Sequence, residues 1–413
     1  MADALAPAGR CGIDSVEVAR IERLLGETPA EDLAKIFSDV ELEESGAGPG
    51  RAASLAARFA AKEACLKLFP RETALGTIDA ADFSIARDNY GAPQVVCGPR
   101  AAAVLGRHRI ASIAVSMTHD RGSASAVAQA ERAAVKVPFY GQLLYRLLPF
   151  RRAVVLENLR RVYGETVPEE EIQRLAQAHY GHLLQLLGEF IHYRFMSAER
   201  KAALVRIENY EAFVAALQLG KGVLILTGHF GNWEVSTLAG LAKYPEFRGR
   251  FHFVRRAFKP RWLDTLITRR FGQAGFGVIG KRGSLDQILD LLAAGDVIVF
   301  PFDQHAAPPD GIEVEFFSHP AWTFRSLAII ALTTGAPVLP ATGWREADGA
   351  HVMHFGEPIP AVEAEDTTDA IRRTTRAYNA ELERLVLDRP EQWYWVHRRW
   401  KASAGKSVKR RAR

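Results

Sequence analysis

The chain has 413 residues, of which 48% are apolar and 24% are charged, and its formal net charge is +5. This composition is typical of a soluble globular protein with two or three domains, and it excludes an intrinsically disordered chain. The basic excess is too small to indicate nucleic acid as a partner, and we expect none.

The first residues, MADALAPAGR, contain no apolar core, so we expect no secretory signal. Three cysteines, Cys11, Cys65 and Cys97, lack the spacing of a metal site and indicate a reducing cytoplasm without a structural disulfide. In the first 130 residues, short apolar strands alternate with an alanine-rich helix, and two strand-like runs flank a polar turn at the end. This pattern predicts an α+β domain.

The alanine-rich helix, ARFAAKEACLKLF, carries Arg58 four residues before Lys62 and Glu63 four residues before Lys67. One interpretation is ordinary ion pairing on a helix surface. The other includes Asp14, which follows a short strand-like start. Magnesium commonly takes one or two protein carboxylates and shares phosphate oxygens, so an Asp from a strand and a Glu from a helix could bind it. The lysines would then meet the remaining phosphate charge.

The character of the sequence changes near residue 135, where we expect a domain boundary. The segment around 138–150 interleaves leucines with Arg146, and Arg151 and Arg152 follow it. It predicts an amphipathic helix, either docked on a protein core or lying on an anionic lipid surface. Helical patterns continue to about residue 215.

Beyond residue 215, the apolar runs GVLILTG, FHFVRR, DVIVFPFD and APVLPATG alternate with helical patterns, which predicts an α/β sheet. The longest uncharged segment, Leu327 to Trp344, approaches the length of a membrane span. Thr333, Thr334 and Gly335 interrupt it together with two prolines, so we predict a buried helix, a turn and a strand. The basic end, 403–413, predicts a disordered tail with a weak attraction to anionic surfaces.

One stretch, TGHFGNWE, combines residues that could transfer a proton. Two glycines bracket His229 after the apolar strand VLIL, and Asn232 is a good N-cap, so Glu234 falls in the first turn of a helix. A turn followed by a helix can bring Glu234 to the imidazole. A carboxylate on one ring nitrogen would fix the tautomer and leave the other nitrogen free as a base. The alternative is a histidine that only satisfies hydrogen bonds within a turn.

The reaction suggested by these residues is a direct transfer. The chain has no G-x-S-x-G elbow and no cysteine placed with the histidine, so a covalent acyl-enzyme is not indicated. We expect His229 to take the proton of an acceptor hydroxyl, which then attacks an activated acyl group. The competing class is a non-enzymatic module that binds a lipid surface or a carrier protein.

The motif HFGNWE resembles the His-x4-Glu block of the lipid A late acyltransferase family, the lauroyl and myristoyl transferases. Further blocks resemble that family in order across residues 137–402, namely ENLRRVYG, VRRAFKP, VIVFPFDQ, FFSHPAWTFRSLAIIALTTGAPVLP and RPEQWYWVHRRWK. The resemblance implies an α/β glycerolipid-acyltransferase-like domain with a helical lead-in. It also implies site residues, which are the catalytic His229, Glu234 and Asp303 and the substrate-binding Arg255 and Asn232.

This resemblance implies acyl-carrier-protein thioesters, or sometimes acyl-CoA, as donors and a lipid or glycolipid as acceptor. A lysophospholipid, an ornithine-type lipid or a polyene lipid could replace the lipid A precursor. It also implies a cytoplasmic protein that is peripheral on the inner membrane, where the segment around 138–150 would contact the anionic surface. Near the end, Arg398 and Arg399 lie among aromatic residues, and are either solvated charges or part of an aromatic–basic surface at a lipid interface.

The runs GIDSVEVARI, IFSDVELE, RFAAKEACLK, NYGAPQV and SMTHDRGSASAVA resemble, in order, the acyl-carrier-protein synthase type of 4′-phosphopantetheinyl transferase, which assigns residues 1–133 to such a domain. The resemblance implies that this domain moves phosphopantetheine from coenzyme A to a serine of an acyl carrier protein. The residues that it implies are the Mg²⁺ ligands Asp14 and Glu63 and the coenzyme A contacts Lys67 and His119, with Arg58 and Lys62 nearby. We therefore expect one domain to arm the carrier and the other to use it. The alternative is a non-catalytic carrier-docking domain at the N-terminus.

Overall fold

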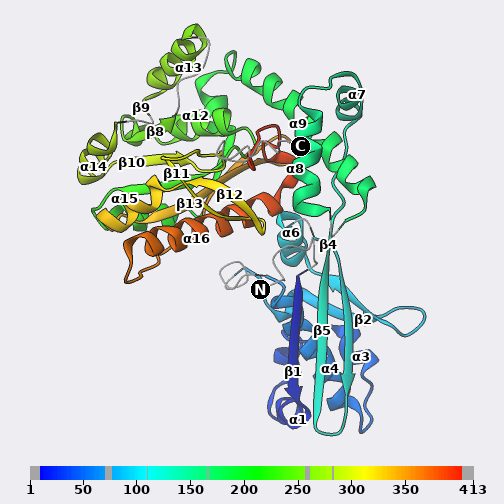
Figure 1. Ribbon diagram of the computed structural model, residues 1–413. Helices are drawn as coiled ribbons and strands as arrows, with labels where there is room; N and C mark the ends of the chain where they lie inside the picture. Colours follow the sequence, from blue (N-terminus) through cyan, green and yellow to red (C-terminus); the bar gives the residue numbers. More distant parts are fainter. Residues whose placement is uncertain are drawn as a thin grey trace, which may run out of the picture. The chain divides into compact units, whose positions relative to one another are not determined.

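The computed structural model divides into two compact units, Met1–Ala134 (unit 1) and Val135–Arg413 (unit 2), whose elements are labelled in Figure 1. The predicted basic tail, 403–413, lies outside the described residues. The structure describes residues 10–69, 77–108, 110–164, 167–255, 261–280 and 283–401.

Unit 1 is an α+β domain in which one long helix, α4 (Arg51–Leu66), packs on an antiparallel sheet (Figure 1). The strand order is β1-β5-β4-β3-β2, and every neighbouring pair is antiparallel. Fully buried alanines on α4 and on β5 allow the helix to lie close to the sheet. The strands are β1 (Cys11–Glu17), β2 (Phe83–Arg87), β3 (Pro93–Cys97), β4 (Ile110–His119) and β5 (Ser123–Arg132). The smaller helices are α1 (Val18–Glu27), α2 (Ala30–Leu33), α3 (Asp39–Glu44), η1 (Ala80–Asp82) and α6 (Pro99–Arg107).

Strand β1 crosses α4 so closely that only glycine fits at position 12. A Cβ atom at Gly12 would lie 2.0 Å from the carbonyl oxygen of Ala64. This close approach brings Asp14, two residues further along β1, to the C-terminal end of α4. Lys67 caps that end, and its Nζ lies 2.8 Å from Asp14 Oδ1.

Unit 2 is built on a seven-stranded sheet of order β6-β14-β13-β7-β10-β8-β9. The strands from β13 to β9 are parallel, β14 is antiparallel to β13, and β6 pairs in parallel with β14. The central strands β7 and β10 are buried along nearly their whole length, which explains why they read as continuous apolar runs. The strands are β6 (Val205–Glu208), β7 (Val223–Thr227), β8 (Phe251–Arg255), β9 (Phe276–Gly280), β10 (Val297–Pro301), β13 (Val338–Arg345), β14 (His351–Phe355) and a separate hairpin of β11 (Gly311–Phe316) and β12 (His319–Phe324).

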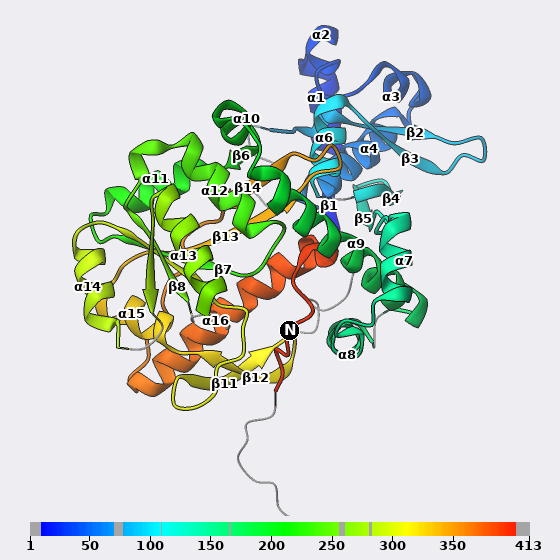
Figure 2. The same cartoon turned by 90° about the horizontal axis from the view of Figure 1, so that it is seen from above.

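Three helices precede this sheet and lie together in both views of unit 2 (Figures 1 and 2), namely α7 (Phe139–Leu147), α8 (Arg152–Tyr163) and α9 (Glu169–Tyr193). Helix α7 packs on α9 through its buried residues Gly141 and Tyr145, while Phe139 and Leu147 stay exposed. The remaining helices are α10 (Ala198–Ala203), α11 (Tyr210–Gln218), α12 (Trp233–Lys243), η2 (Pro245–Phe247), α13 (Arg261–Ala274), α14 (Leu285–Ala293), α15 (Ser326–Thr334), α16 (Thr367–Asp388) and η3 (Pro390–Gln392).

The long uncharged segment folds as predicted. Helix α15 ends at Thr334, Gly335 adopts the left-handed conformation with φ of 64°, and β13 follows. Within the described ranges, no helix combines the length and apolar character needed to cross a membrane.

Candidate functional sites

The site in unit 2 lies at the C-terminal ends of two neighbouring parallel strands. Strand β7 ends at Thr227 and β10 ends at Pro301, and these two residues are paired in register. The carboxyl ends of parallel strands meet at one edge of a sheet, so the turn after β7 faces the segment after β10. This topology brings His229 and Asp303 together although they are 74 residues apart in sequence.

The buried carboxylate of Asp303 holds His229 through its backbone and its ring. It accepts the backbone N–H of His229 at 2.8 Å and the ring Nδ1–H at 2.9 Å. The indole N–H of Trp393 also donates to Asp303 Oδ2, at 3.0 Å. With the Nδ1–H donated to Asp303, Nε2 is the acceptor atom of the ring, and Gln304 Nε2 lies 3.5 Å from it.

The segment from Trp393 to His397, which we call the closing segment, packs against His229 and Asp303 and holds them by further hydrogen bonds. Trp393 forms a β-bridge with Phe230, and Tyr394 donates its backbone N–H to the carbonyl of His229 at 3.1 Å. His397 Nε2 donates to the carbonyl oxygen of Asp303 at 2.8 Å. Sequence reasoning missed the roles of Trp393 and His397, because their partners are 90 and 94 residues away in the chain.

Of the two interpretations of the segment near the end of the chain, the aromatic–basic surface is not formed, and a solvated charge is found only at Arg398, which is exposed. Trp393, Trp395 and Arg399 are fully buried. Arg399 donates to the carbonyl oxygen of Trp322 at 2.9 Å and to the hydroxyl of Thr323 at 2.7 Å. Trp393, Trp395, Val396 and Arg399 therefore belong to the protein core, whereas Arg398 is exposed.

The helix that carries Glu234 begins where the sequence predicts. Asn232 caps α12, and its side-chain oxygen accepts the N–H of Val235 at 3.2 Å. Asn232 is itself buried and donates to Glu189 Oε2 at 2.8 Å. Both ends of its amide are thus used within the protein, so the predicted substrate contact of Asn232 is wrong.

The turn before α12 requires glycine at position 231. Its φ is +50°, and a Cβ atom there would lie 2.6 Å from the carbonyl oxygen of Gly343. The turn places the ring of Trp233 against that of His229, with 4.8 Å between the ring centroids. Glu234 and His229 line the same pocket, but the carboxylate that fixes the tautomer belongs to Asp303. The prediction that Glu234 holds the ring is therefore wrong, and Glu234 acts on it through charge.

Charges around the ring control the proton affinities of this site. Burial lowers the pKa of His229, but the charge and hydrogen bond of Asp303 and the charge of Glu234 outweigh it, so the pKa is raised. Burial would raise the pKa of Asp303, yet the charge of His229 and its hydrogen bonds hold it well below its usual range. Burial raises the pKa of Glu234 against the opposing charges of Arg270, His229 and Arg255.

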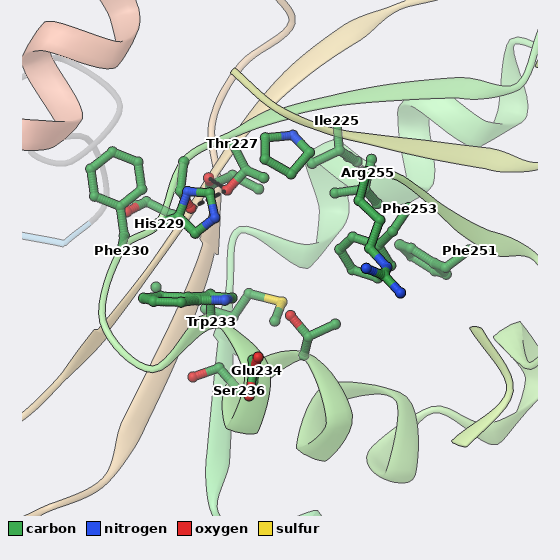
Figure 3. A pocket seen from close by; sticks show the side chains of 18 of the residues that line it. Ile225, Thr227, His229, Phe230, Trp233, Glu234, Ser236, Phe251, Phe253 and Arg255 are labelled. Atoms are coloured by element: carbon green, nitrogen blue, oxygen red, sulfur yellow. Dashed lines mark hydrogen bonds between the residues drawn. The ribbon is translucent and has the colours of Figure 1, made fainter. Parts of the chain in front are cut away.

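A pocket of about 340 Å³ opens beside these residues. Figure 3 shows His229, Trp233 and Glu234 at one end and Arg255, Phe251 and Phe253 at the other. Most of the wall away from His229 is apolar and is formed by Ile225, Phe251, Phe253, Val254, Ile267, Phe271, Val278, Val299, Met353 and Phe355. An apolar pocket that ends at a histidine can hold a hydrocarbon chain with its reactive group at the base.

Arg255 lines this pocket, as expected for a substrate contact. Its guanidinium forms an ion pair with Asp264 at 2.7 Å and donates to the hydroxyl of Thr268. Contact of Arg255 with a substrate stays a prediction.

In unit 1, Asp14 and Glu63 lie together at the crossing of β1 and α4. Burial raises the pKa of Glu63, and the negative charge of Asp14 adds to this effect. Lys67 donates to Asp14 Oδ1 and, at 2.9 Å, to the carbonyl oxygen of Ile13. His119 ends β4 on the sheet face that also carries Asp14, with β5 between the two strands, and it is exposed.

This pair of partly exposed carboxylates fits Mg²⁺, which prefers oxygen ligands and shares them with water and phosphate. In the part of the chain that the structure describes, no group of three or more His, Cys, Asp or Glu side chains could hold a metal ion. Water and phosphate oxygens would therefore supply the remaining ligands of an ion held by Asp14 and Glu63.

Two other predicted coenzyme A contacts in unit 1 are wrong. Lys62 is fully buried and pairs with the buried Glu41 at 2.7 Å. Arg58 is also buried, pairs with Glu44 at 2.7 Å and donates to the carbonyl oxygen of Ile85 at 3.2 Å. The spacing of these residues along the helix did not reveal that this side of α4 faces the core.

Comparisons with known proteins agree with the two units. Residues 133–402 match the family described as bacterial lipid A biosynthesis acyltransferase. Residues 10–125 match the 4′-phosphopantetheinyl transferase superfamily. A holo-[acyl-carrier-protein] synthase of Moorella thermoacetica is 38% identical over 120 residues, which cover 29% of this chain and 91% of that protein.

Two further relatives extend the comparison. A phosphatidylinositol mannoside acyltransferase of Mycobacterium tuberculosis is 24% identical over 197 residues, which cover 47% of this chain and 59% of that protein. The solved structure of the Helicobacter pylori holo-[acyl-carrier-protein] synthase in complex with coenzyme A is 27% identical. It covers 29% of this chain and 99% of that one, with a TM-score of 0.25.

The protein is thus a fusion of two transferase domains. The chain belongs to the bacterial lipid A biosynthesis acyltransferase family, whose match spans most of its length, and its N-terminal unit belongs to the 4′-phosphopantetheinyl transferase superfamily. It is an acyltransferase that carries a holo-acyl-carrier-protein synthase domain.

Proposed function

We propose that unit 2 transfers a fatty acyl chain from a thioester of acyl carrier protein, or of coenzyme A, to a hydroxyl of a lipid such as a lipid A precursor. The observation that carries this proposal is the ring of His229. Its Nδ1–H donates to the buried carboxylate of Asp303, its Nε2 is left as the acceptor atom of the ring with Gln304 Nε2 at 3.5 Å, and the ring lines a largely apolar pocket. A buried carboxylate, an imidazole and an apolar pocket together suit acyl transfer to an alcohol.

In the proposed reaction, Nε2 of His229 removes the proton of the acceptor hydroxyl as its oxygen attacks the thioester carbonyl. The new C–O bond forms, the C–S bond breaks, and the thiolate takes the proton from the imidazolium. Asp303 and Glu234 favour the imidazolium by charge, since both raise the pKa of His229. The apolar wall would hold the acyl chain, and Arg255, which pairs with Asp264, would also contact an anionic group of the acceptor.

A lipid acceptor requires access to a membrane, and one exposed apolar face of unit 2 supports this. Arg270 of α13 lies 3.9 Å from the ring centroid of Phe190 on α9, and α9 in turn packs on α7. We call this surface the α7–α9–α13 face. Its exposed apolar residues are Phe139, Leu143, Leu147, Leu184, Leu187, Ile191, Phe195, Trp262 and Leu266. Exposed arginines on the same helices and just beyond α9 are Arg146, Arg194, Arg261 and Arg269.

This composition suits a peripheral protein on the anionic, cytoplasmic face of the inner membrane. The protein should therefore co-sediment with vesicles that contain anionic phospholipid. Leu147→Asp should reduce the fraction of protein that co-sediments. Equal binding to purely zwitterionic vesicles, or no effect of the substitution, would contradict the assignment of this face.

For unit 1, we propose transfer of phosphopantetheine from coenzyme A to a serine of an acyl carrier protein. Asp14 and Glu63 would hold Mg²⁺, which neutralises phosphate charge when bound. Lys67 and His119 lie at the same end of the domain and would contact the phosphates of coenzyme A.

Each unit supplies the control for the other. His229→Ala should abolish transfer of an acyl chain from acyl carrier protein to a lipid A precursor, while mass spectrometry of apo carrier with coenzyme A and magnesium still finds added phosphopantetheine. Asp14→Ala should give the opposite pattern. Undiminished acyl transfer by His229→Ala would refute the role of the histidine. If the wild-type chain adds no phosphopantetheine, unit 1 is a carrier-docking domain instead.

The candidate acceptors are hydroxyl groups of a lysophospholipid, an ornithine-type lipid, a polyene lipid or a glycolipid. The similarity to an enzyme named as a phosphatidylinositol mannoside acyltransferase favours a glycolipid. Lipid profiles of a strain without the gene identify the acceptor, because the missing species carries one acyl chain more than the lipid that accumulates.

A further inference from the structure

A second, smaller cavity of about 60 Å³ lies beyond the apolar end of the pocket in unit 2. We call it the distal chamber. It shares four lining residues with the main pocket, namely Thr237, Phe251, Met353 and Phe355. The other residues that line it are Ile207, Tyr210, Phe213, Gly240, Leu241, Tyr244, Phe247 and Phe276. None of these residues carries a charge, so the chamber suits only an uncharged, largely apolar group.

Helix α12 covers both cavities with one face. Trp233 lines the main pocket, Thr237 lines both cavities, and Gly240 and Leu241 line only the distal chamber. Residues spaced by three and four positions lie on the same side of a helix. A chain that enters beside His229 and runs along this face of α12 therefore reaches the distal chamber.

Met353 and Gly240 lie close together at the wall that the two cavities share. Met353 belongs to the wall that both cavities share, and Gly240 faces it from α12. A Cβ atom at Gly240 would lie 3.5 Å from Met353 Cε, at ordinary contact distance. The methionine side chain is unbranched and adaptable, so it can move aside for a hydrocarbon chain that a rigid side chain would block.

We propose that the distal chamber binds the methyl end of the acyl chain, and that Met353 and Gly240 set the longest chain that unit 2 accepts. This proposal rests on the acyl transfer proposed above and adds its chain-length specificity. Every methylene that is kept out of an apolar site costs about fourfold in affinity or kcat/KM. Donors that differ by two carbons should thus be separated by about fifteenfold once the chamber is filled.

The test uses the full chain with Gly240→Leu, which fills the chamber, and Gly188→Leu as the matched control. Gly188 also lies inside a long helix, α9, but nothing would lie within 4 Å of its Cβ. Binding of saturated fatty acids of increasing even length is measured first, because it requires no catalysis. Transfer from acyl carrier proteins loaded with the same chains is measured second.

We expect Gly240→Leu to lose affinity for the longest bound chains by at least about fifteenfold and to keep affinity for shorter ones. Gly188→Leu should match the wild type. Met353→Ala should extend the series to longer chains. Gly240→Ala adds only one methyl group without a clash, and it should show the same shift in smaller degree even if the leucine variant does not fold.

An unchanged chain-length series in both Gly240 variants would overturn the proposal, as would an equal shift in Gly188→Leu. Failure of the acyl transfer itself is a separate result. In that case the wild type binds fatty acids with a chain-length limit but transfers none from any donor, and the limit still moves with Gly240.

Discussion

Asp303→Asn separates the orienting role of the carboxylate from its role in the fold. Two of its hydrogen bonds, from the His229 backbone and from the Trp393 indole, go to Oδ2, and an asparagine oxygen can accept both. The asparagine NH₂ group then replaces Oδ1 and faces Nδ1 of the ring. Nδ1 must accept this hydrogen bond, so the ring proton moves to Nε2. The nitrogen that should remove the acceptor proton is then no longer a base.

The loss of activity expected for Asp303→Asn follows from the distance between the carboxylate and the imidazole ring. Asp303 Oδ1 lies 2.9 Å from Nδ1 of His229. With an effective dielectric constant of about 20, removal of a unit charge at this distance weakens its interaction with the imidazolium by about 6 kcal/mol. Part of the attraction between Asp303 and the imidazolium only offsets the cost of burying the two charges. We therefore expect kcat/KM for acyl transfer to fall by about 10³–10⁴.

The pH profile supplies an independent measurement. The base works when it is neutral, so activity of the wild type should rise as pH increases through the raised pKa of His229. In Asp303→Asn the charge is gone and burial dominates, so the remaining activity should rise at lower pH than in the wild type. Asp296→Asn is the matched control, because Asp296 pairs with His252 Nε2 at 2.9 Å outside the pocket. A loss below about tenfold, or an acid limb that does not move, would refute the assigned orientation of His229.

Three further substitutions test neighbouring contacts. Glu234→Gln should lower kcat at least about tenfold and shift the acid limb of the pH profile to lower pH. The reason is that the wild-type charge of Glu234 stabilises the imidazolium of His229, and the glutamine cannot. An unchanged pH profile would contradict this. Trp393→Phe removes one donor to Asp303 and should cost about 1.5–3 kcal/mol of transition-state stabilisation; steady-state kinetics showing wild-type kcat/KM would disprove it. Glu41→Gln leaves buried Lys62 without its charge partner and should lower the unfolding free energy of unit 1 by about 3–5 kcal/mol in denaturant; a change below about 1 kcal/mol speaks against it, and acyl transfer by unit 2 is the control.

Local signals in the sequence were sufficient for the elements around the site. The apolar runs of β7 and β10 and the N-cap Asn232 each act within a few residues, and the structure has them as predicted. The resemblance to a family pointed to Asp303. No local pattern assigned the ring contact to Asp303 instead of Glu234, because that contact depends on the parallel register of two strands.

The errors in unit 1 have a different cause. Spacing along α4 shows which charges share a helix face, but it does not show whether that face is exposed. Alanines at 60, 61 and 64 are fully buried around Lys62, so nearly the whole circumference of the helix is covered. This run of small apolar residues was the available signal, because a helix that is apolar on all sides is expected in a core.

The closing segment behind His229 also determines when the enzyme can begin to work. A ribosome makes the chain from its N-terminus, and domains generally fold as they emerge. Unit 1 is complete long before Trp393, Tyr394 and His397 are synthesised. His229 and Asp303 lack their hydrogen bonds to these residues until the residues have left the exit tunnel. The nascent protein would therefore complete unit 1 before the site around His229 in unit 2 is fully assembled.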